Sequence, residues 1–366
     1  MFSLDLDSSK CVRAVTKFST CDNCLLTCPT NAISFNSDNN LPNILPSSCV
    51  NCGGCVGSCP SEALSLDFHS NTDFFFDFVQ EDESLLSCKK NLPCLAVLTS
   101  EHLLSMALLK EGVTFDVGHC KTCELKEPLY KIITDRVDEV NYLLEAMESD
   151  SRVSLKELAY EPPEGDITHN RREFLEQFSL KNALKQKEVF DKEVEIDPDE
   201  FMDFGLDSID VSKIKNKQFP DKRKILFTAL KRAKVPDTLH VLNASDLTFV
   251  STKELDYDSC TACQMCYRIC PTGALSTDYK NSKIDFDASM CIKCAVCHDV
   301  CEPKSITLSD TFGMDNFFKP SVKQLVKFKI RRCYECDSYF DYRGGEVICP
   351  RCKLEEDEAK ELWGLN

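Results

Sequence analysis

The arrangement of the cysteines constrains this chain more than any other feature of its sequence. The 366 residues include 24 cysteines. One run, beginning at Cys260, has the spacing C-x2-C-x2-C-x3-C-P, and a second run with the same cysteine spacing begins at Cys291. Reduced cysteines set this close together in short loops are typical of metal ligands rather than of disulfides. The sequence therefore indicates metal centres.

The same spacing occurs again near the N-terminus. Seven cysteines there each have a counterpart 242 residues further along the chain. The N-terminal members are Cys21, Cys24, Cys28, Cys49, Cys52, Cys55 and Cys59, and their counterparts are Cys263, Cys266, Cys270, Cys291, Cys294, Cys297 and Cys301. The flanking residues also match, because CPTNAIS at 28–34 corresponds to CPTGALS at 270–276. The match indicates an internal duplication of one folded unit.

Both modules resemble the bacterial dicluster ferredoxins, over about residues 8–70 and 246–312. In that pattern the first three thiolates of each run bind one [4Fe–4S] cluster and the fourth binds its neighbour. The C-terminal ligand sets are then Cys260, Cys263, Cys266 and Cys301 for one cluster, and Cys291, Cys294, Cys297 and Cys270 for the other. The sequence departs from the family at Glu302, which stands between Cys301 and Pro303. The resemblance implies low-potential one-electron transfer without substrate chemistry, since four thiolates leave no open position.

The N-terminal module lacks one ligand at the repeat position. The counterpart of Cys260 would be residue 18, which is Phe18. We expect Cys11 to supply the missing thiolate, with residues 12–20 bulging over the cluster. The N-terminal ligand sets are then Cys11, Cys21, Cys24 and Cys59 for one cluster, and Cys49, Cys52, Cys55 and Cys28 for the other. The alternative is that Cys11 is a spare thiol and the site holds a [3Fe–4S] cluster or none.

A third cysteine pattern lies near the C-terminus. It consists of two C-x2-C pairs, Cys333 with Cys336 and Cys349 with Cys352, separated by twelve residues that include Gly344 and Gly345. Two such pairs close a tetrahedral site of four thiolates, and the glycines allow the hairpin between them to turn. We predict a structural zinc ribbon, with a rubredoxin-like iron as the alternative.

The remaining four cysteines match no pattern that we can name. They are Cys88, Cys94, Cys120 and Cys123. The surrounding sequence predicts strands over 74–79 and 113–117 and helices over 95–110 and 128–147. Cys120 and Cys123 would then follow a strand, where ligand loops commonly project. We interpret the quartet as a fifth metal site, either iron–sulfur or zinc, against the alternative of buried or incidental thiols.

Residues 151–245 contain no cysteine and many charged residues, and we expect helices that link the two ends of the chain. Two segments look like known motifs: NRREFL at 170–175 like a twin-arginine export signal, and FGLDSID at 204–210 like a phosphopantetheine attachment site at Ser208. We expect the first to be an ordinary helix start and the second a capped loop. A basic helix over 222–234 is expected to present a solvated face.

Together these patterns predict an α+β fold in five parts. The parts are a ferredoxin-like dicluster module at 1–70, a small α/β cysteine-containing domain at 71–150, a charged helical linker at 151–245, a second dicluster module at 246–312 and a zinc ribbon tail at 313–366. The net charge of −17 opposes binding to nucleic acid. Without a secretory signal or an apolar run of roughly 18–20 residues, we expect a cytoplasmic protein with no membrane insertion.

This organisation predicts a polyferredoxin that relays electrons between redox partners through four [4Fe–4S] clusters. By analogy of fold, the partner would be an enzyme such as a formate dehydrogenase, a hydrogenase or a nitrate reductase. The alternative is an accessory, assembly or redox-sensing protein for a metalloenzyme such as a molybdenum oxidoreductase. A free-standing enzyme is disfavoured, because the sequence has no dinucleotide fingerprint and no convincing catalytic constellation. We therefore name no catalytic residue.

Overall fold

The computed structural model describes residues 3–110, 112–161, 217 and 219–363. The N-terminal module consists of short elements that alternate with the cysteine loops. They are β1 (Leu4–Leu6), α1 (Val12–Val15), α2 (Asn23–Thr27), β2 (Ile33–Phe35), β3 (Pro42–Ile44), α3 (Gly54–Ser58) and β4 (Leu64–Leu66). Strand β1 pairs antiparallel with β4, and β2 pairs antiparallel with β3. The helices α2 and α3 carry Cys24 and Cys55, so the two cysteine runs face each other inside the module.

The C-terminal module repeats this plan and adds to it. Its elements are β9 (Lys253–Leu255), α12 (Met265–Arg268), β10 (Leu275–Ser276), β11 (Lys283–Asp287), α13 (Val296–Asp299), β12 (Ile306–Leu308) and β14 (Val322–Lys327). Strands β9 and β12 pair antiparallel, and β14 extends the hairpin of β10 and β11 into three strands. The flanking elements are β8 (Val241–Asn243), the 3-10 helix η4 (Ala244–Asp246), β13 (Thr311–Gly313) and α14 (Asp315–Phe318).

An α/β unit lies between the two modules in the sequence. Its elements are α4 (Asn71–Gln80), β5 (Leu85–Leu86), the 3-10 helix η1 (Leu95–Val97), α5 (Ser100–Leu109), β6 (Val113–Asp116), the 3-10 helix η2 (Cys120–Thr122), α6 (Lys126–Ala146) and β7 (Val153–Lys156). The three strands form one parallel sheet in the order β5, β6, β7. The strand predicted over 113–117 and the helix predicted over 128–147 are confirmed by β6 and α6.

Two predictions in this unit need correction. The strand predicted over 74–79 is a helix, α4, because Ser70 caps it by accepting from the amide of Asp73 and the helical spacing buries Phe75 together with Phe78. The helix predicted over 95–110 begins only at Ser100, after the turn η1. Helix α5 is also buried from residue 100 to 107 rather than on one face, since other elements cover it on several sides.

The stretch expected to be a helical linker is not wholly helical. Residues 153–156 form the edge strand β7, because they pair with β6 and continue the parallel sheet. A helix does form where one was predicted over 222–234, namely α11 (Asp221–Arg232). Its basic face is not wholly solvated, since Lys222 and Arg223 are buried against α5. The motif-like segments at 170–175 and 204–210 lie outside the described residues.

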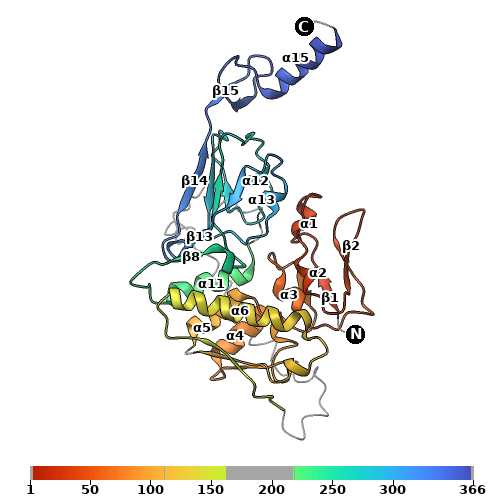
Figure 1. The fold of residues 1–366 in the computed structure, drawn as a ribbon, viewed down its shortest axis with the longest axis vertical. Coiled ribbons are helices and arrows are strands. Elements are labelled where there is room, and N and C mark those ends of the chain that lie inside the picture. Colours follow the sequence, from red (N-terminus) through yellow and green to blue (C-terminus); the bar gives the residue numbers. More distant parts are fainter. Residues whose placement is uncertain (1–2, 111, 162–216, 218, 364–366) are drawn as a thin grey trace.

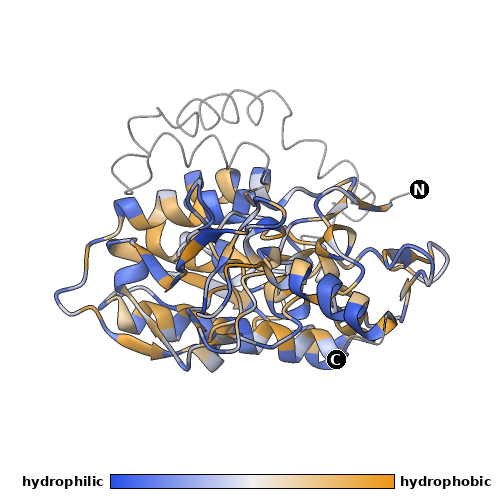
Figure 2. Ribbon diagram, turned by 90° about the horizontal axis from the view of Figure 1, so that it is seen from above, coloured by the Kyte–Doolittle hydropathy of each residue, from blue (hydrophilic) through white to orange (hydrophobic). Residues whose placement is uncertain are grey.

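The α/β unit and the C-terminal module share one hydrophobic core, whereas the N-terminal module has two small cores of its own. Hydrophobic and hydrophilic residues alternate along the helices of the body (Figure 2). The C-terminal tail, comprising β15 (Ile330–Arg332), β16 (Tyr339–Asp341) and α15 (Pro350–Leu362), projects beyond the C-terminal module at one end of the long axis (Figure 1). Among the helices described, none is long and apolar enough to cross a membrane.

Candidate iron–sulfur and metal centres

Four cavities in the two modules are each lined by four cysteines. In the N-terminal module one is lined by Cys11, Cys21, Cys24 and Cys59, and the other by Cys28, Cys49, Cys52 and Cys55. In the C-terminal module one is lined by Cys260, Cys263, Cys266 and Cys301, and the other by Cys270, Cys291, Cys294 and Cys297. The four cavities have similar volumes, about 320–360 Å³. The structure thus gathers the four sets of cysteines expected from the sequence, with the fourth cysteine of each run crossing to the neighbouring cavity.

Strand register places Cys11 at the position of Cys260. Leu4 of β1 pairs with Leu66, and Lys253 of β9 pairs with Leu308, so the two strands are equivalent. Cys11 follows Leu4 at the same interval at which Cys260 follows Lys253. The extra residues of the N-terminal module therefore lie after Cys11 rather than before it. The repeated Leu-Asp pair that precedes each cysteine, at 6–7 and 255–256, is a signal that the constant offset of 242 missed.

The segment between Cys11 and Cys21 only partly covers its cavity. Val12 and Arg13 line the cavity. The far end of the segment turns away instead, and Thr20 donates to Asp299 from its amide, at 3.0 Å, and from its hydroxyl, at 2.9 Å. Asp299 belongs to α13 of the C-terminal module. The extra residues therefore connect the two modules directly.

The donor sets fit iron–sulfur clusters. Each cavity offers four thiols, which is the ligand set of a [4Fe–4S] cluster. Among the described residues, three or more metal-binding side chains have their donor atoms within 4.8 Å of one another only at Cys333, Cys336, Cys349 and Cys352. The cysteines of the four cavities are thus spread too widely for a single ion, as a cluster of several iron and sulfur atoms requires.

Comparison with protein families agrees with this geometry. Two family models, each described as a 4Fe–4S dicluster domain, match residues 10–63 and 252–302. The chain therefore contains two 4Fe–4S dicluster domains of the ferredoxin type. The matches cover the two ferredoxin modules and leave the α/β unit and the tail outside. A comparison with curated proteins found no significant match.

Helix α11 joins both ferredoxin modules to the α/β unit. Arg223 donates to the Glu101 carboxylate at 2.7 Å and to the carbonyl of Cys291 at 3.1 Å. Lys222 lies 3.4 Å from the same carboxylate and donates to the carbonyl of Cys59 at 2.7 Å. Burial raises the pKa of Glu101, but the charges of Lys222 and Arg223 outweigh it, so the pKa ends below its usual value. A buried ionic group thus holds a cysteine loop of each ferredoxin module.

Burial favours the protonated form of several of the cavity thiols. Burial, followed by the charges of neighbouring thiolates, raises the pKa of Cys24 and of Cys266 to about 12. Cluster binding must therefore displace these protons. In the N-terminal module the amides of Ala32 and Ala63 already donate to the sulfurs of Cys28 and Cys59, both at 3.2 Å. Such bonds to sulfur are one of the ways in which a protein adjusts a cluster potential.

The two ferredoxin modules differ in the charge beside one pair of equivalent cavities. Lys253 lines the cavity of Cys270, Cys291, Cys294 and Cys297, whereas Leu4 lines the cavity of Cys28, Cys49, Cys52 and Cys55. Lys253 is buried, and its ammonium lies 2.8 Å from Nε2 of His298. Burial raises the pKa of Cys297 to about 12, although the charge of Lys253 opposes that shift. A buried cation therefore faces one cavity and not its counterpart.

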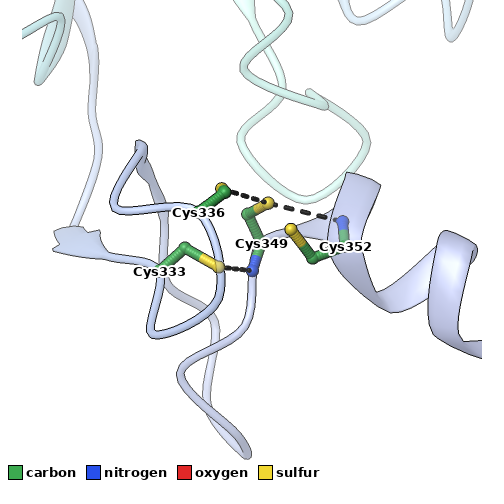
Figure 3. Close-up of side chains that lie close together, drawn as sticks. All are labelled: Cys333, Cys336, Cys349 and Cys352. Carbon is green, nitrogen blue, oxygen red and sulfur yellow. Dashed lines mark hydrogen bonds between the residues drawn. The ribbon is translucent and has the colours of Figure 1, made fainter.

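The C-terminal quartet has a different geometry. The sulfurs of Cys333, Cys336, Cys349 and Cys352 lie within 4.8 Å of one another and converge on one point (Figure 3). The amide of Cys349 donates to the sulfur of Cys333 at 3.2 Å, and hydrogen bonds from Ser338 lower the pKa of Cys336 to about 6. These four thiols can hold one metal ion. Arg343 of the same tail donates to the carbonyls of Tyr257, Asp258 and Cys260, which docks the tail beside a cluster cavity.

The fifth quartet lies at the carboxyl ends of two neighbouring strands. Cys88 follows β5, and Cys120 follows β6. Burial and then the thiolates of Cys52, Cys120 and Cys88 raise the pKa of Cys94 to about 12, and burial and then the thiolates of Cys88 and Cys123 raise that of Cys120 to about 11. Cys88, Cys94 and Cys120 are therefore within electrostatic reach of one another, Cys123 is within reach of Cys120, and Cys94 is also within reach of Cys52 in the N-terminal module.

Proposed function

We propose that this protein relays electrons between two redox partners through [4Fe–4S] clusters bound in its four cysteine-lined cavities. The observation that carries this proposal is the direct contact between Thr20 and Asp299, which joins the two ferredoxin modules next to their cysteines. A pair of modules that served separate partners would need no such contact. When bound, a [4Fe–4S] cluster accepts and releases one electron.

Within each module the cavities are also adjacent. Burial and then the thiolates of Cys52 and Cys24 raise the pKa of Cys55, so cysteines of the two N-terminal cavities act on each other. Burial and then the thiolate of Cys297 raise the pKa of Cys266 in the same way. The contact through Thr20 connects these two pairs. Two pairs of adjacent cavities joined by this contact support a relay better than two independent carriers.

Described residues outside the cysteine runs help to position these cavities. Lys222 and Arg223 of α11, paired with Glu101 of α5, hold the loops of Cys59 and Cys291, so the two modules cannot easily shift relative to each other. Val12, Arg13 and the core around them limit the access of water to the first cavity. We assign the tail quartet to a structural zinc ion, because four converging thiolates leave no position for water.

The partners proposed are redox enzymes such as a formate dehydrogenase, a hydrogenase or a nitrate reductase. The acidic chain, with a net charge of −17, favours docking onto a basic surface of such a partner. This assignment to a partner class rests on analogy of fold.

A second candidate function is an accessory or assembly role, with a client bound by the tail. Helix α15 has no buried residue, and Leu362 and Trp363 at its end are 85% and 76% exposed. A measurement of electron transfer between the modules distinguishes the two candidate functions, because an assembly factor does not need to pass electrons from one module to the other.

The test of the relay is a one-electron donor and a one-electron acceptor applied to the anaerobically reconstituted protein. We expect the donor to reduce all four clusters and the acceptor to reoxidise them. Electron paramagnetic resonance follows both steps and should show measurable spin coupling between the modules. Asp299→Ala should weaken that coupling and slow reoxidation of one module. Asp22→Ala is the matched control, since Asp22 adjoins Cys21 in the sequence and, within the described part of the chain, makes no hydrogen bond to the other module. Clusters of one module that stay redox-inactive would exclude the relay.

A further inference from the structure

The loops that carry the fifth quartet are held by a dense hydrogen-bond network. The buried carboxylate of Asp116 accepts from the hydroxyl of Ser87 at 3.3 Å, from the amide of Gly118 at 3.0 Å and from the amide of Tyr160 at 2.7 Å. Ser87 precedes Cys88, and Gly118 stands two residues before Cys120. The buried carboxylate of Asp116 therefore holds both the loop that follows β5 and the loop that follows β6. Metal sites are commonly supported by such outer hydrogen bonds.

A second segment closes over the same loops. The amides of Leu158 and Ala159 also donate to Asp116, at 3.1 and 2.9 Å. A side chain at Gly118 would collide with this segment, because its Cβ would lie 2.4 Å from the backbone nitrogen of Ala159. His119 approaches the carbonyl of Tyr160 at 2.9 Å. The chain thus forms a covered and fixed loop around Cys120, whereas a set of incidental thiols needs no such support.

The spread of the sulfurs distinguishes a cluster from a single ion. A zinc ion bound by four thiolates at about 2.3 Å brings their sulfurs to about 4 Å from one another. The tail quartet meets that condition, but among the described residues no three of the sulfurs of Cys88, Cys94, Cys120 and Cys123 lie within 4.8 Å of one another. The quartets of the four ferredoxin cavities share this wider spacing. Like the ferredoxin sites, the fifth quartet therefore lacks the close group of sulfurs that a single-ion site such as the tail presents.

The fifth quartet also adjoins the N-terminal ferredoxin module. Helix α3, which carries Cys55, packs against η1, which follows Cys94. The approach is close enough that a Cβ at Gly57 would lie 2.2 Å from the carbonyl oxygen of Ala96. The buried guanidinium of Arg136 locks the contact by donating to the carbonyls of Ala96 and Leu98, both at 2.7 Å, and to the hydroxyl of Ser58 at 2.8 Å.

We propose that Cys88, Cys94, Cys120 and Cys123 bind a fifth iron–sulfur cluster, next to the cluster held by Cys28, Cys49, Cys52 and Cys55. With this site, each of the 24 cysteines belongs to one of six quartets. The cluster would adjoin the N-terminal pair of cavities, and its exchange of electrons with the Cys52 cluster rests on the relay proposed above. The binding of the cluster itself does not depend on the relay.

The test uses the full chain, reconstituted anaerobically and analysed for iron, sulfide and zinc. We expect about two to four iron atoms above the total for four [4Fe–4S] clusters, with matching sulfide, and one zinc ion. The variant Cys123→Ala should lose at least one of these additional irons. It removes an exposed side chain, so the core stays packed. Thr122→Ala, in the same turn, is the matched control and should retain the wild-type iron content.

Two further readouts decide the outcome. Mössbauer spectra of the wild type should contain a component that disappears or changes in Cys123→Ala, and the signal of the reduced Cys52 cluster should lose a spin interaction in the same variant. Two zinc ions per chain, or iron no higher than the four-cluster total in the wild type, would overturn the proposal. Failure of the relay would show differently, as electrons that do not pass although the additional iron is present.

Discussion

Lys253 faces the cluster cavity of the C-terminal ferredoxin module at the position where Leu4 faces the equivalent cavity of the N-terminal module. A second difference also adds a positive charge to the C-terminal module, because Lys293 there corresponds to Asn51 in the N-terminal module. A positive charge favours the more negative, reduced state of a cluster. The C-terminal cluster held by Cys291 is therefore expected to have the higher potential, and electrons to run toward the C-terminal module.

Substitution of Lys253 and of Leu4 tests the expected difference in cluster potential. Lys253→Leu should lower the potential of the Cys291 cluster by on the order of 50–100 mV, as the removal of one charge in an effective dielectric constant near 20 predicts. Leu4→Lys should raise the potential of the Cys52 cluster. A redox titration followed by electron paramagnetic resonance measures both. Lys280→Leu, which removes an exposed lysine of the same module, should leave every potential unchanged.

Removal of the buried carboxylate should destabilise the protein. Glu101→Gln leaves Arg223 and Lys222 buried without a counter-charge, which typically costs about 3–5 kcal/mol. The free energy of unfolding of the cluster-loaded protein, from denaturant titration, measures the loss. Glu157→Gln breaks an exposed ion pair with Lys121, of 2.7 Å, and should leave the free energy of unfolding nearly unchanged, because solvent screens such a pair. Equal effects of the two substitutions would contradict the role given to Glu101.

The same carboxylate predicts a dependence on pH. Because the pKa of Glu101 is lower in the folded protein than in the unfolded chain, its contribution to stability is complete above the unfolded pKa, near 4.5. That contribution is lost as the pH falls through the folded value. The difference in unfolding free energy between wild type and Glu101→Gln should thus be constant from pH 8 to about 5 and shrink below that range. A difference that grows on acidification would refute this account.

Loss of the tail metal should unfold the tail alone. A chelator is expected to release one zinc ion and to expose residues 330–363 to limited proteolysis, since metal binding and folding are coupled in such sites. The signals of the iron–sulfur clusters should persist. Because zinc binding requires all four cysteines of the quartet as thiolates, zinc should be lost more readily as the pH falls. Retention of a protease-resistant tail in chelator would rule out structural zinc.

Cys11 can be tested against its counterpart. Cys11→Ser should damage one cluster of the N-terminal module, converting it to a three-iron form or losing it. Cys260→Ser should damage one cluster of the C-terminal module in the same way, which makes it the matched variant. Electron paramagnetic resonance and iron analysis separate the two. A spectrum of Cys11→Ser identical to that of the wild type would show that Cys11 is not a ligand.

The sequence by itself determined where the cysteine-lined cavities form. Ligands for one cluster come from short runs such as Cys49, Cys52 and Cys55, so their spacing along the chain is nearly their spacing in space. The constant offset also revealed the duplication, and it failed only at Cys11, where seven extra residues interrupt the repeat. Strand β6 and helix α6 could likewise be predicted, because their apolar periodicity is local.

Only the tertiary structure decided how these parts are joined. Thr20 and Asp299 are 279 residues apart, and Arg223 and Glu101 are 122 apart, so no local pattern announces either contact. The run of aromatic residues at 74–79 suits a strand or a helix, and its packing in the core made it α4. A basic helix usually faces water, but Lys222 and Arg223 are buried because one distant carboxylate and the carbonyls of two cysteine loops satisfy them. Such pairings are fixed by the fold as a whole, since burial of a charge depends on partners that only folding brings near.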